Sequence, residues 1–154
     1  MMPYASAGMG MVRSLRSYGQ FWRFNETLFA PLALLLRGHD RAVAAALAVS
    51  LLLAAFLAWR QVEPARAALV MVTATLLLSP NVLPWYALWL LPLLVLLDAP
   101  ALLCFTGTVG LAYLVYPDWR AGQPWHLGWG VRALEYLPCL AAAVWLKGRS
   151  GRGN

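Results

Sequence analysis

The sequence predicts an all-α, polytopic membrane protein with about five transmembrane helices, preceded by a short interfacial helix near the N-terminus. Hydrophobic residues make up 62% of the 154-residue chain and charged residues 12%, whereas soluble proteins average about 45–50% and about 25%. The charged residues lie between long apolar segments, where helices leave a bilayer. Because unpaired backbone groups are costly in lipid, helices are the expected spanning form.

We expect a single membrane domain with a polar N-terminal segment at 1–25 and a basic tail at 147–154. Residues 27–36 are too few to span about 30 Å of hydrocarbon and predict an interfacial or re-entrant helix. A break is expected between Ser79 and Pro84, because prolines remove backbone donors from a continuous helix. The transmembrane helices are predicted at 42–59, 65–79, 82–97, 101–116 and 133–146.

Several local features refine these helices. Asp98 is expected to cap the helix that begins near Pro100. Gly107 and Gly110 predict a kink or a close helix contact rather than a phosphate loop. Hydroxyl side chains inside the helices are expected to bond to their own backbone, which argues against a transporter. These hydroxyls belong to Ser50, Thr73, Thr75, Thr106 and Thr108.

The charge pattern excludes other classes of protein. The net charge of +6 is spread between apolar segments, whereas nucleic-acid sites gather Lys and Arg on one face, so no nucleic-acid partner is expected. Cys104 and Cys139 lie within apolar runs and have no metal-ligand spacing. We therefore expect inert thiols, no metal and no cofactor.

Three clusters of polar and aromatic residues lie next to apolar segments. The first spans residues 21–26 and allows two interpretations. Trp22 and Phe24 suit an interfacial anchor, whereas Asn25 and Glu26 suit a segment that faces a substrate.

The second cluster spans residues 79–89. Its two prolines leave backbone groups without helical partners, which membranes tolerate only in protein-buried or wet regions. Trp85, Tyr86 and Trp89 suit either an interfacial aromatic belt or a platform for a sugar ring or a prenyl chain.

The third cluster spans residues 118–138. Arg120, His126 and Arg132 are cationic or titratable groups suited to a phosphate at the interface. Arg132 and Glu135 are three residues apart, so they predict either a local helix-surface pair or a role toward substrate.

The segments RFNETLF, LLLSPNVLPWYALWLLPLL, AYL and ALEYLP, in this order, resemble the C-terminal half of bacterial polytopic glycosyltransferases of the GT-C type. In particular, the chain is similar to the mannosyltransferase-like branch, whose donor is a polyprenyl-phosphate sugar, and the similarity covers residues 21–146. Two departures stand out. Leu83 occupies a place where members often carry His, and nothing matches the acidic catalytic loop near the N-terminus of these longer enzymes. The resemblance thus implies a C-terminal portion.

The resemblance implies an enzyme that moves a mannose-like sugar to a lipid or glycan acceptor at the outer membrane face. Glu26 and Glu135 are weak candidates for the catalytic base. Implied partners are membrane lipids, the polyprenyl-phosphate-linked donor, the acceptor and a missing N-terminal half. The implied location is a bacterial cytoplasmic membrane with the basic tail inside. The implied substrate-binding residues are Asn25, Trp85, Tyr86, Trp89, Arg120, His126, Arg132 and Tyr136.

A small, non-catalytic membrane scaffold or subunit is the alternative. The regular spacing of Ala42, Ala46, Ser50, Ala54 and Ala58 favours it, since small-residue stripes let helices pack closely in lipid.

Overall fold

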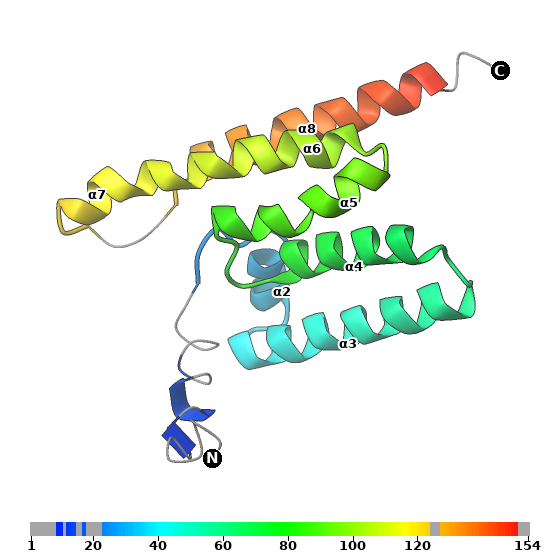
Figure 1. Cartoon of the computed structure of the whole chain (residues 1–154). Helices are drawn as coiled ribbons and strands as arrows, with labels where there is room; N and C mark the ends of the chain where they lie inside the picture. The colour runs from blue at the N-terminus through cyan, green and yellow to red at the C-terminus, as the bar shows by residue number, and fades with distance from the viewer. Residues whose placement is uncertain (1–8, 11, 15–16, 18–22, 124–126, 151–154) are drawn as a thin grey trace, which may run out of the picture.

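The computed structural model describes residues 9–10, 12–14, 17, 23–123 and 127–150. The described part is helical, and its β-type contact is an isolated bridge between Phe24 and Asn81. The predicted all-α class is confirmed. Figure 1 shows the helices stacked in successive layers, with α8 and α6 at one side of the stack and α3 at the other.

The first three helices are α2 (Phe29–Leu35), α3 (His39–Trp59) and α4 (Pro64–Leu78). Helices α3 and α4 form an antiparallel hairpin (Figure 1). A left-handed residue follows each of α2 and α3, two positions after the last helical residue. These residues are Arg37 with φ 52° and Gln61 with φ 48°. The following amides bond back to the last turn, as in the Schellman motif. The hairpin geometry is therefore fixed by local capping.

The chain leaves the helical conformation between α4 and the next element. Ser79 and Leu83 both have extended backbone angles. Helix η2 (Pro84–Trp89) is a 3₁₀ helix and is followed by the short helix α5 (Leu91–Leu96). This places the two-proline segment between helices, in contact with residues from distant parts of the chain.

Helices α6 (Pro100–Thr108), η3 (Val109–Val115) and α7 (Tyr116–Arg120) follow one another as a rod along α8 (Trp129–Ser150). One expectation was wrong here: Ala99, rather than Asp98, is the N-cap residue of α6, and no described side chain bonds to that end. Of the two alternatives for Gly107 and Gly110, the close helix contact is not formed, because a Cβ at either position would meet no atom within 4 Å. The change from α to 3₁₀ geometry comes directly after Thr108, between the two glycines.

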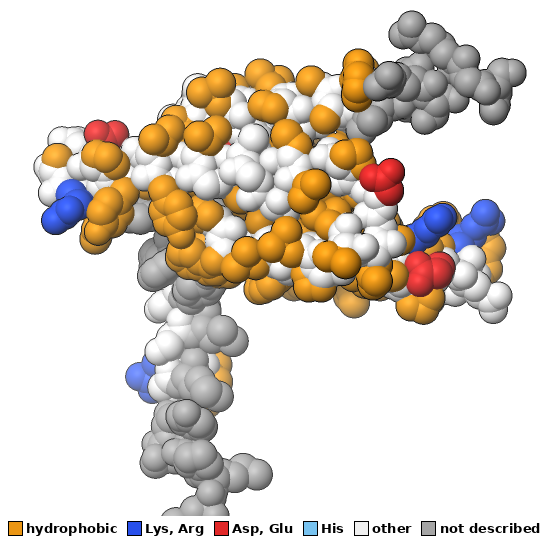
Figure 2. All heavy atoms as spheres, turned by 45° about the horizontal axis from the view of Figure 1, so that its top comes forward, with side chains coloured by type: hydrophobic (Ala, Val, Ile, Leu, Met, Phe, Trp, Pro, Cys, Tyr) orange, Lys and Arg blue, Asp and Glu red, His pale blue; other side chains and the backbone are white. Residues whose placement is uncertain are grey.

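Two helical stretches are long and apolar enough to cross a membrane by length and composition, His39–Trp59 and Pro100–Arg120. Pro64–Leu78 and Pro84–Leu96 are apolar but shorter. Hydrophobic side chains cover most of the face in Figure 2, and charged side chains lie toward its edges. On α3, for example, Leu47, Leu51, Leu52 and Phe56 are exposed. A helix with apolar residues on its outer face suits a lipid environment.

The hydroxyls within the helices bond as expected. Thr73 donates to the carbonyl of Leu69 at 2.7 Å, and Ser50 donates to the carbonyl of Ala46 at 2.8 Å. Thr75 and Thr106 also donate to backbone carbonyls of their own helix. The prediction is confirmed for these four side chains, whereas the hydroxyl of Thr108 makes its shortest contact with a carbonyl of α8.

Two clusters of buried hydrophobic residues form the core. One includes Leu76, Leu90 and Phe105 and joins α4 and α6 to the junction between η2 and α5. The other includes Phe24 and Leu83 and joins the segment before α2 to η2 and η3. Tyr86 packs against both, so η2 lies where the two meet.

Candidate functional site

The segment before α2 pairs with the segment after α4. The amide of Phe24 donates to the carbonyl of Pro80 at 3.0 Å, and the amide of Val82 donates to the carbonyl of Phe24 at 2.8 Å. A third bond runs from the amide of Leu28 to the carbonyl of Leu77 at 3.0 Å. These bonds satisfy backbone groups that the proline break frees, as burial requires. They also bring the first and second polar clusters together.

The third cluster joins them through Asn25 and Glu135. The side-chain Nδ2 of Asn25 donates to Oε1 of Glu135 at 2.7 Å, and both residues are 0% exposed. Asn25 has φ 54°, a left-handed conformation that Asn adopts more readily than most residues. This backbone turn directs the amide toward α8. This buried pair joins the first and third clusters, and the backbone bonds of the neighbouring Phe24 join the second cluster to the first.

A shell of charged groups lies beside this pair. The guanidinium of Arg23 binds the carboxylate of Glu26 through two nitrogens, with Nη2 at 2.8 Å from Oε2. This hydrogen bond raises the pKa of Arg23. Arg132 Nη1 donates to the carbonyl of Glu26 at 3.2 Å, and Cζ of the same guanidinium lies 5.1 Å from the centre of the Trp129 ring. The expected Arg132–Glu135 surface pair is wrong, because among the described residues Glu135 bonds to Asn25 instead.

Two further bonds fix the turn of α8 that carries Glu135. Thr27 donates to the hydroxyl of Tyr136, whose ring stacks on Phe105 with centroids 5.4 Å apart. Thr108 of α6 donates to the carbonyl of Glu135 at 2.8 Å. Pro138 has no amide hydrogen, so its presence in α8 weakens the helix at this point. The two bonds hold this turn of α8 to the segment before α2 and to α6.

Some buried polar atoms of the site have no hydrogen-bond partner among the described residues. They are Oδ1 of Asn25, Oε2 of Glu135 and Nε of Arg132. An unsatisfied buried group costs about 1–3 kcal/mol. Unsatisfied buried polar atoms are found where a bound ligand or an ordered water supplies the missing hydrogen bond. The site therefore has two acceptors and one cationic donor to spare.

An aromatic group from η2 borders the site. Tyr86 and Trp89 stack with ring centroids 4.9 Å apart, and Trp85 meets the edge of Tyr86 at 6.1 Å. Trp85 is 48% exposed and Trp89 is 55% exposed. The two tryptophan rings thus offer open surface, as either a membrane-interface belt or a sugar platform would, while Tyr86 is partly buried between them and the core.

Not every expected residue reaches this place. Arg120 is exposed at the end of α7, against the ring of Tyr116, and α7 lies at the end of the rod in Figure 1. His126 lies outside the described residues. Leu83, at the place where the resemblance puts a His in other members, belongs to the buried cluster that includes Phe24 and Val115. Its side chain is therefore part of the core.

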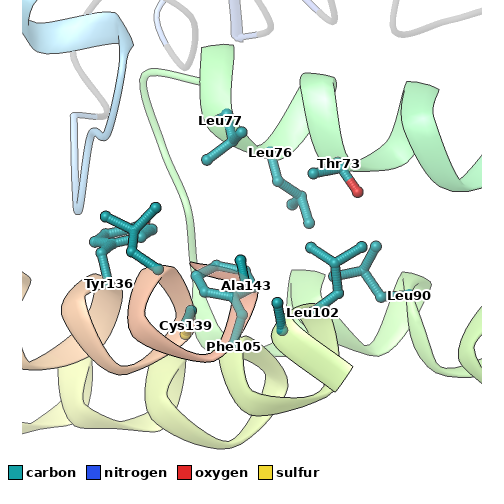
Figure 3. A pocket seen from close by; sticks show the side chains of 11 residues that line it. Thr73, Leu76, Leu77, Leu90, Leu102, Phe105, Tyr136, Cys139 and Ala143 are labelled. Carbon is teal, nitrogen blue, oxygen red and sulfur yellow. The ribbon is translucent and has the colours of Figure 1, made fainter. Parts of the chain in front are cut away.

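An apolar pocket of about 220 Å³ opens beside Tyr136. Figure 3 shows its walls from α4, α6 and α8, with Leu76, Phe105 and Cys139 pointing inward. Tyr136 belongs to both places, since its ring lines the pocket while its hydroxyl bonds to Thr27 next to Asn25. A polar centre thus adjoins an apolar pocket, an arrangement that suits an amphiphilic molecule.

Sequence reasoning missed four residues of this site. Asn81 forms the bridge to Phe24, and Arg23, Thr27 and Thr108 supply the bonds described above. The proximity of Arg23 and Thr27 to Asn25 was the available signal. Thr108 gave none, because its bond to Glu135 spans 27 residues and depends on how α6 packs on α8.

Among the described residues, no group of acidic, His or Cys side chains is arranged to hold a metal ion. No protein-family model matches the sequence, and comparisons with curated proteins and with solved structures gave no significant match.

Proposed function

We propose that this chain is the C-terminal, membrane-embedded portion of a glycosyltransferase that uses a polyprenyl-phosphate sugar as donor. The observation that carries the proposal is the bond between Asn25 and Glu135. It unites the first and third of the clusters that resemble the GT-C enzymes, and the backbone bonds of Phe24 add the second, although the three are far apart in the sequence. Residues that merely anchor helices at an interface have no need to meet at one buried point.

The proposed chemistry is transfer of a mannose-like sugar to a hydroxyl of a lipid or glycan acceptor. The acceptor oxygen bonds to the anomeric carbon, the bond from that carbon to the phosphate oxygen breaks, and polyprenyl phosphate leaves. A carboxylate takes the hydroxyl proton. Both carboxylate oxygens of Glu26 are bonded to Arg23, so neither is free to face an acceptor hydroxyl. The base belongs to a part of the enzyme that this chain does not match, or to Glu135.

The residues of this chain then bind and orient the substrates. Arg132, with an unpartnered Nε, stabilises the charge that develops on the leaving phosphate. Trp85, Tyr86 and Trp89 support a sugar ring, since sugars stack on aromatic faces. The apolar pocket beside Tyr136 takes the first part of the lipid chain.

We further propose that five helices cross a bacterial cytoplasmic membrane, with the basic tail on the cytoplasmic side. Short apolar stretches such as Pro64–Leu78 would then span by tilting, thinning the bilayer locally or adding flanking aromatic residues. Cysteine accessibility tests this topology. A single cysteine at Asn154, in a background with Cys104 and Cys139 replaced by alanine, should react with a membrane-impermeant maleimide only after the cells are opened.

A photo-crosslinking experiment tests the proposed donor. Membranes that contain the chain are irradiated with a polyprenyl-phosphate mannose that carries a benzophenone in its lipid. We expect labelling that unlabelled polyprenyl-phosphate mannose suppresses and that Arg132→Gln reduces about tenfold, the loss of one charge-assisted bond.

Two variants of α8 provide a matched pair for the pocket. Ala143→Leu fills the pocket and should reduce labelling, whereas Ala141→Leu changes an exposed position outside the pocket and should not. Labelling that the unlabelled donor leaves unchanged, or that both variants reduce equally, would contradict the proposal.

A further inference from the structure

We infer that Cys104 and Cys139 are an oxidisable thiol pair, which reacts with an apolar disulfide to form a covalent link between α6 and α8. This reaction does not depend on the proposed sugar transfer. The sequence predicts two inert thiols in separate apolar runs, and both cysteines are free in the structure. The packing of α6 on α8 brings the two thiols together, and this contact is what makes them a reactive pair.

The contacts of Thr108 show how α6 lies on α8. The two helices run in opposite directions (Figure 1). Oγ1 of Thr108 lies 2.8 Å from the carbonyl oxygen of Glu135 and 3.4 Å from Sγ of Cys139. The same atom lies 3.2 Å from the carbonyl oxygen of Cys104 in its own helix. One small side chain therefore touches the backbone of both helices, so the helices approach closely at this point.

This close approach places the two thiols opposite each other. A step of four residues is about one turn, or about 6 Å, along either helix. One step back from Thr108 reaches Cys104, and one step forward from Glu135 reaches Cys139. The side chain of Cys104 is a hydrogen-bond partner of the Cys139 side chain. A disulfide requires two cysteine side chains that face each other, and the hydrogen-bonded pair meets this condition.

The surroundings of the pair indicate which oxidant fits. Both cysteines are half-buried rather than enclosed. Cys139 lines the apolar pocket beside Tyr136 and points into it (Figure 3), so a reagent in the pocket meets this thiol first. The pocket walls are mostly hydrocarbon and aromatic groups, which favour an apolar reagent.

The reaction consists of two successive thiol–disulfide exchanges. The sulfur of Cys139 attacks one sulfur of the reagent, the sulfur–sulfur bond of the reagent breaks, and half of the reagent leaves as a thiol with the proton of Cys139. The sulfur of Cys104 then attacks the sulfur of Cys139. The second half leaves with the proton of Cys104, and the bond between the two cysteines forms. The cysteines are oxidised, and the reagent is reduced to two thiols.

The test uses the full chain in lipid nanodiscs and the membrane-permeant disulfide dithiodipyridine, whose halves leave as thiopyridones that absorbance detects. We expect two thiopyridones per chain and a monomer whose intact mass is lower by two hydrogens. The second release should be about tenfold or more faster than the first, because it is intramolecular.

Two variants test the route through the pocket. Ala143→Leu fills the pocket and should slow the first release several-fold. Ala141→Leu changes an exposed position outside the pocket and should leave the rate unchanged. Equal first rates in these two variants would contradict entry through the pocket and overturn the inference.

Two further variants test the facing positions. Cys104→Ala should release one thiopyridone and keep the other half as a mixed disulfide on Cys139. Leu103→Cys in the Cys104→Ala background moves the thiol about 100° around α6 to an exposed position. This variant should carry two mixed disulfides and form no internal disulfide.

Mixed disulfides that persist on both cysteines of the unchanged chain would overturn the inference. So would a disulfide between two chains in place of the internal one, or an internal disulfide that forms equally well from position 103. The mass of the unchanged chain is the decisive measurement, and it does not depend on the folding of any variant.

Discussion

The side-chain amide of Asn25 donates a 2.7 Å hydrogen bond to the carboxylate of Glu135, 110 residues later in the chain. Both side chains are fully buried. The bond links the segment before α2 to the turn of α8 that contains Tyr136 and is followed by Pro138. The geometry of the candidate site depends on this contact more than on any single helix.

Asn25→Asp should destabilise the protein strongly. The substitution places a second carboxylate against Glu135 in a buried place, and uncompensated buried charge costs about 3–5 kcal/mol. Unfolding in mild detergent, followed by circular dichroism, measures this. The exchanged pair Asn25→Asp with Glu135→Gln restores one amide and one carboxylate and should recover most of the loss. No recovery in the double variant would show that the pair is not the cause.

The bond between Thr27 and Tyr136 should contribute about 0.5–1.5 kcal/mol to stability. A double-mutant cycle with Thr27→Val and Tyr136→Phe isolates it, because each change removes one hydroxyl and keeps most of the shape. We expect a coupling free energy in that range from thermal unfolding in detergent. Additive effects of the two changes would mean that the hydroxyls do not interact.

Glu63 caps the start of α4 and should make stability depend on pH. Its carboxylate accepts from the amides of Ala65 and Arg66, both at 2.9 Å, and these bonds lower the pKa of Glu63. Because the folded pKa lies below the unfolded one, the stabilisation is present above the unfolded pKa and disappears as pH falls through the folded pKa.

Glu63→Gln retains one acceptor oxygen and does not titrate. The unfolding temperature of this variant should therefore fall less steeply with decreasing pH than that of the unchanged protein. Thermal unfolding of both proteins between neutral and acidic pH measures the difference. Parallel pH profiles for the two proteins would contradict a role for this cap.

Gly107→Ala should stabilise the protein by about 0.5–1 kcal/mol, since alanine is the better helix former. A Cβ at this position meets no atom within 4 Å. Gly122 is the matched control, because its φ of 82° makes Gly122→Ala unfavourable by about 1–2 kcal/mol. Detergent unfolding should therefore move in opposite directions for the two variants. A loss of stability in Gly107→Ala would indicate a tight contact there.

The chain should remain in the membrane fraction after alkaline carbonate extraction. Exposed apolar side chains cover α3, and a helix of this kind prefers lipid to water. Centrifugation and immunoblotting of the washed membranes measure the outcome. Release of most of the chain into the soluble fraction would contradict the membrane interpretation for the stretches His39–Trp59 and Pro100–Arg120.

Much of the fold follows from local features of the sequence. Apolar runs and prolines predicted where helices occur, and hydroxyls such as Thr73 bond to their own helix as expected. Asp98 shows the limit of such reasoning. Aspartate is a favoured N-cap residue and Asp98 lies two positions before Pro100, yet the backbone angles make Ala99 the N-cap of α6. Helix ends depend on backbone angles that residue type influences but does not fix.

The sequence by itself determined the helical class, the apolar character of the segments and the three clusters in which polar residues concentrate. Only the tertiary structure decided that Asn25 faces Glu135, that Arg132 turns to the carbonyl of Glu26 and that Leu83 belongs to the core. The reason is physical. Periodicity, hydropathy and proline act within a few residues, whereas a bond across 110 residues depends on how α2, η2, α6 and α8 pack against one another.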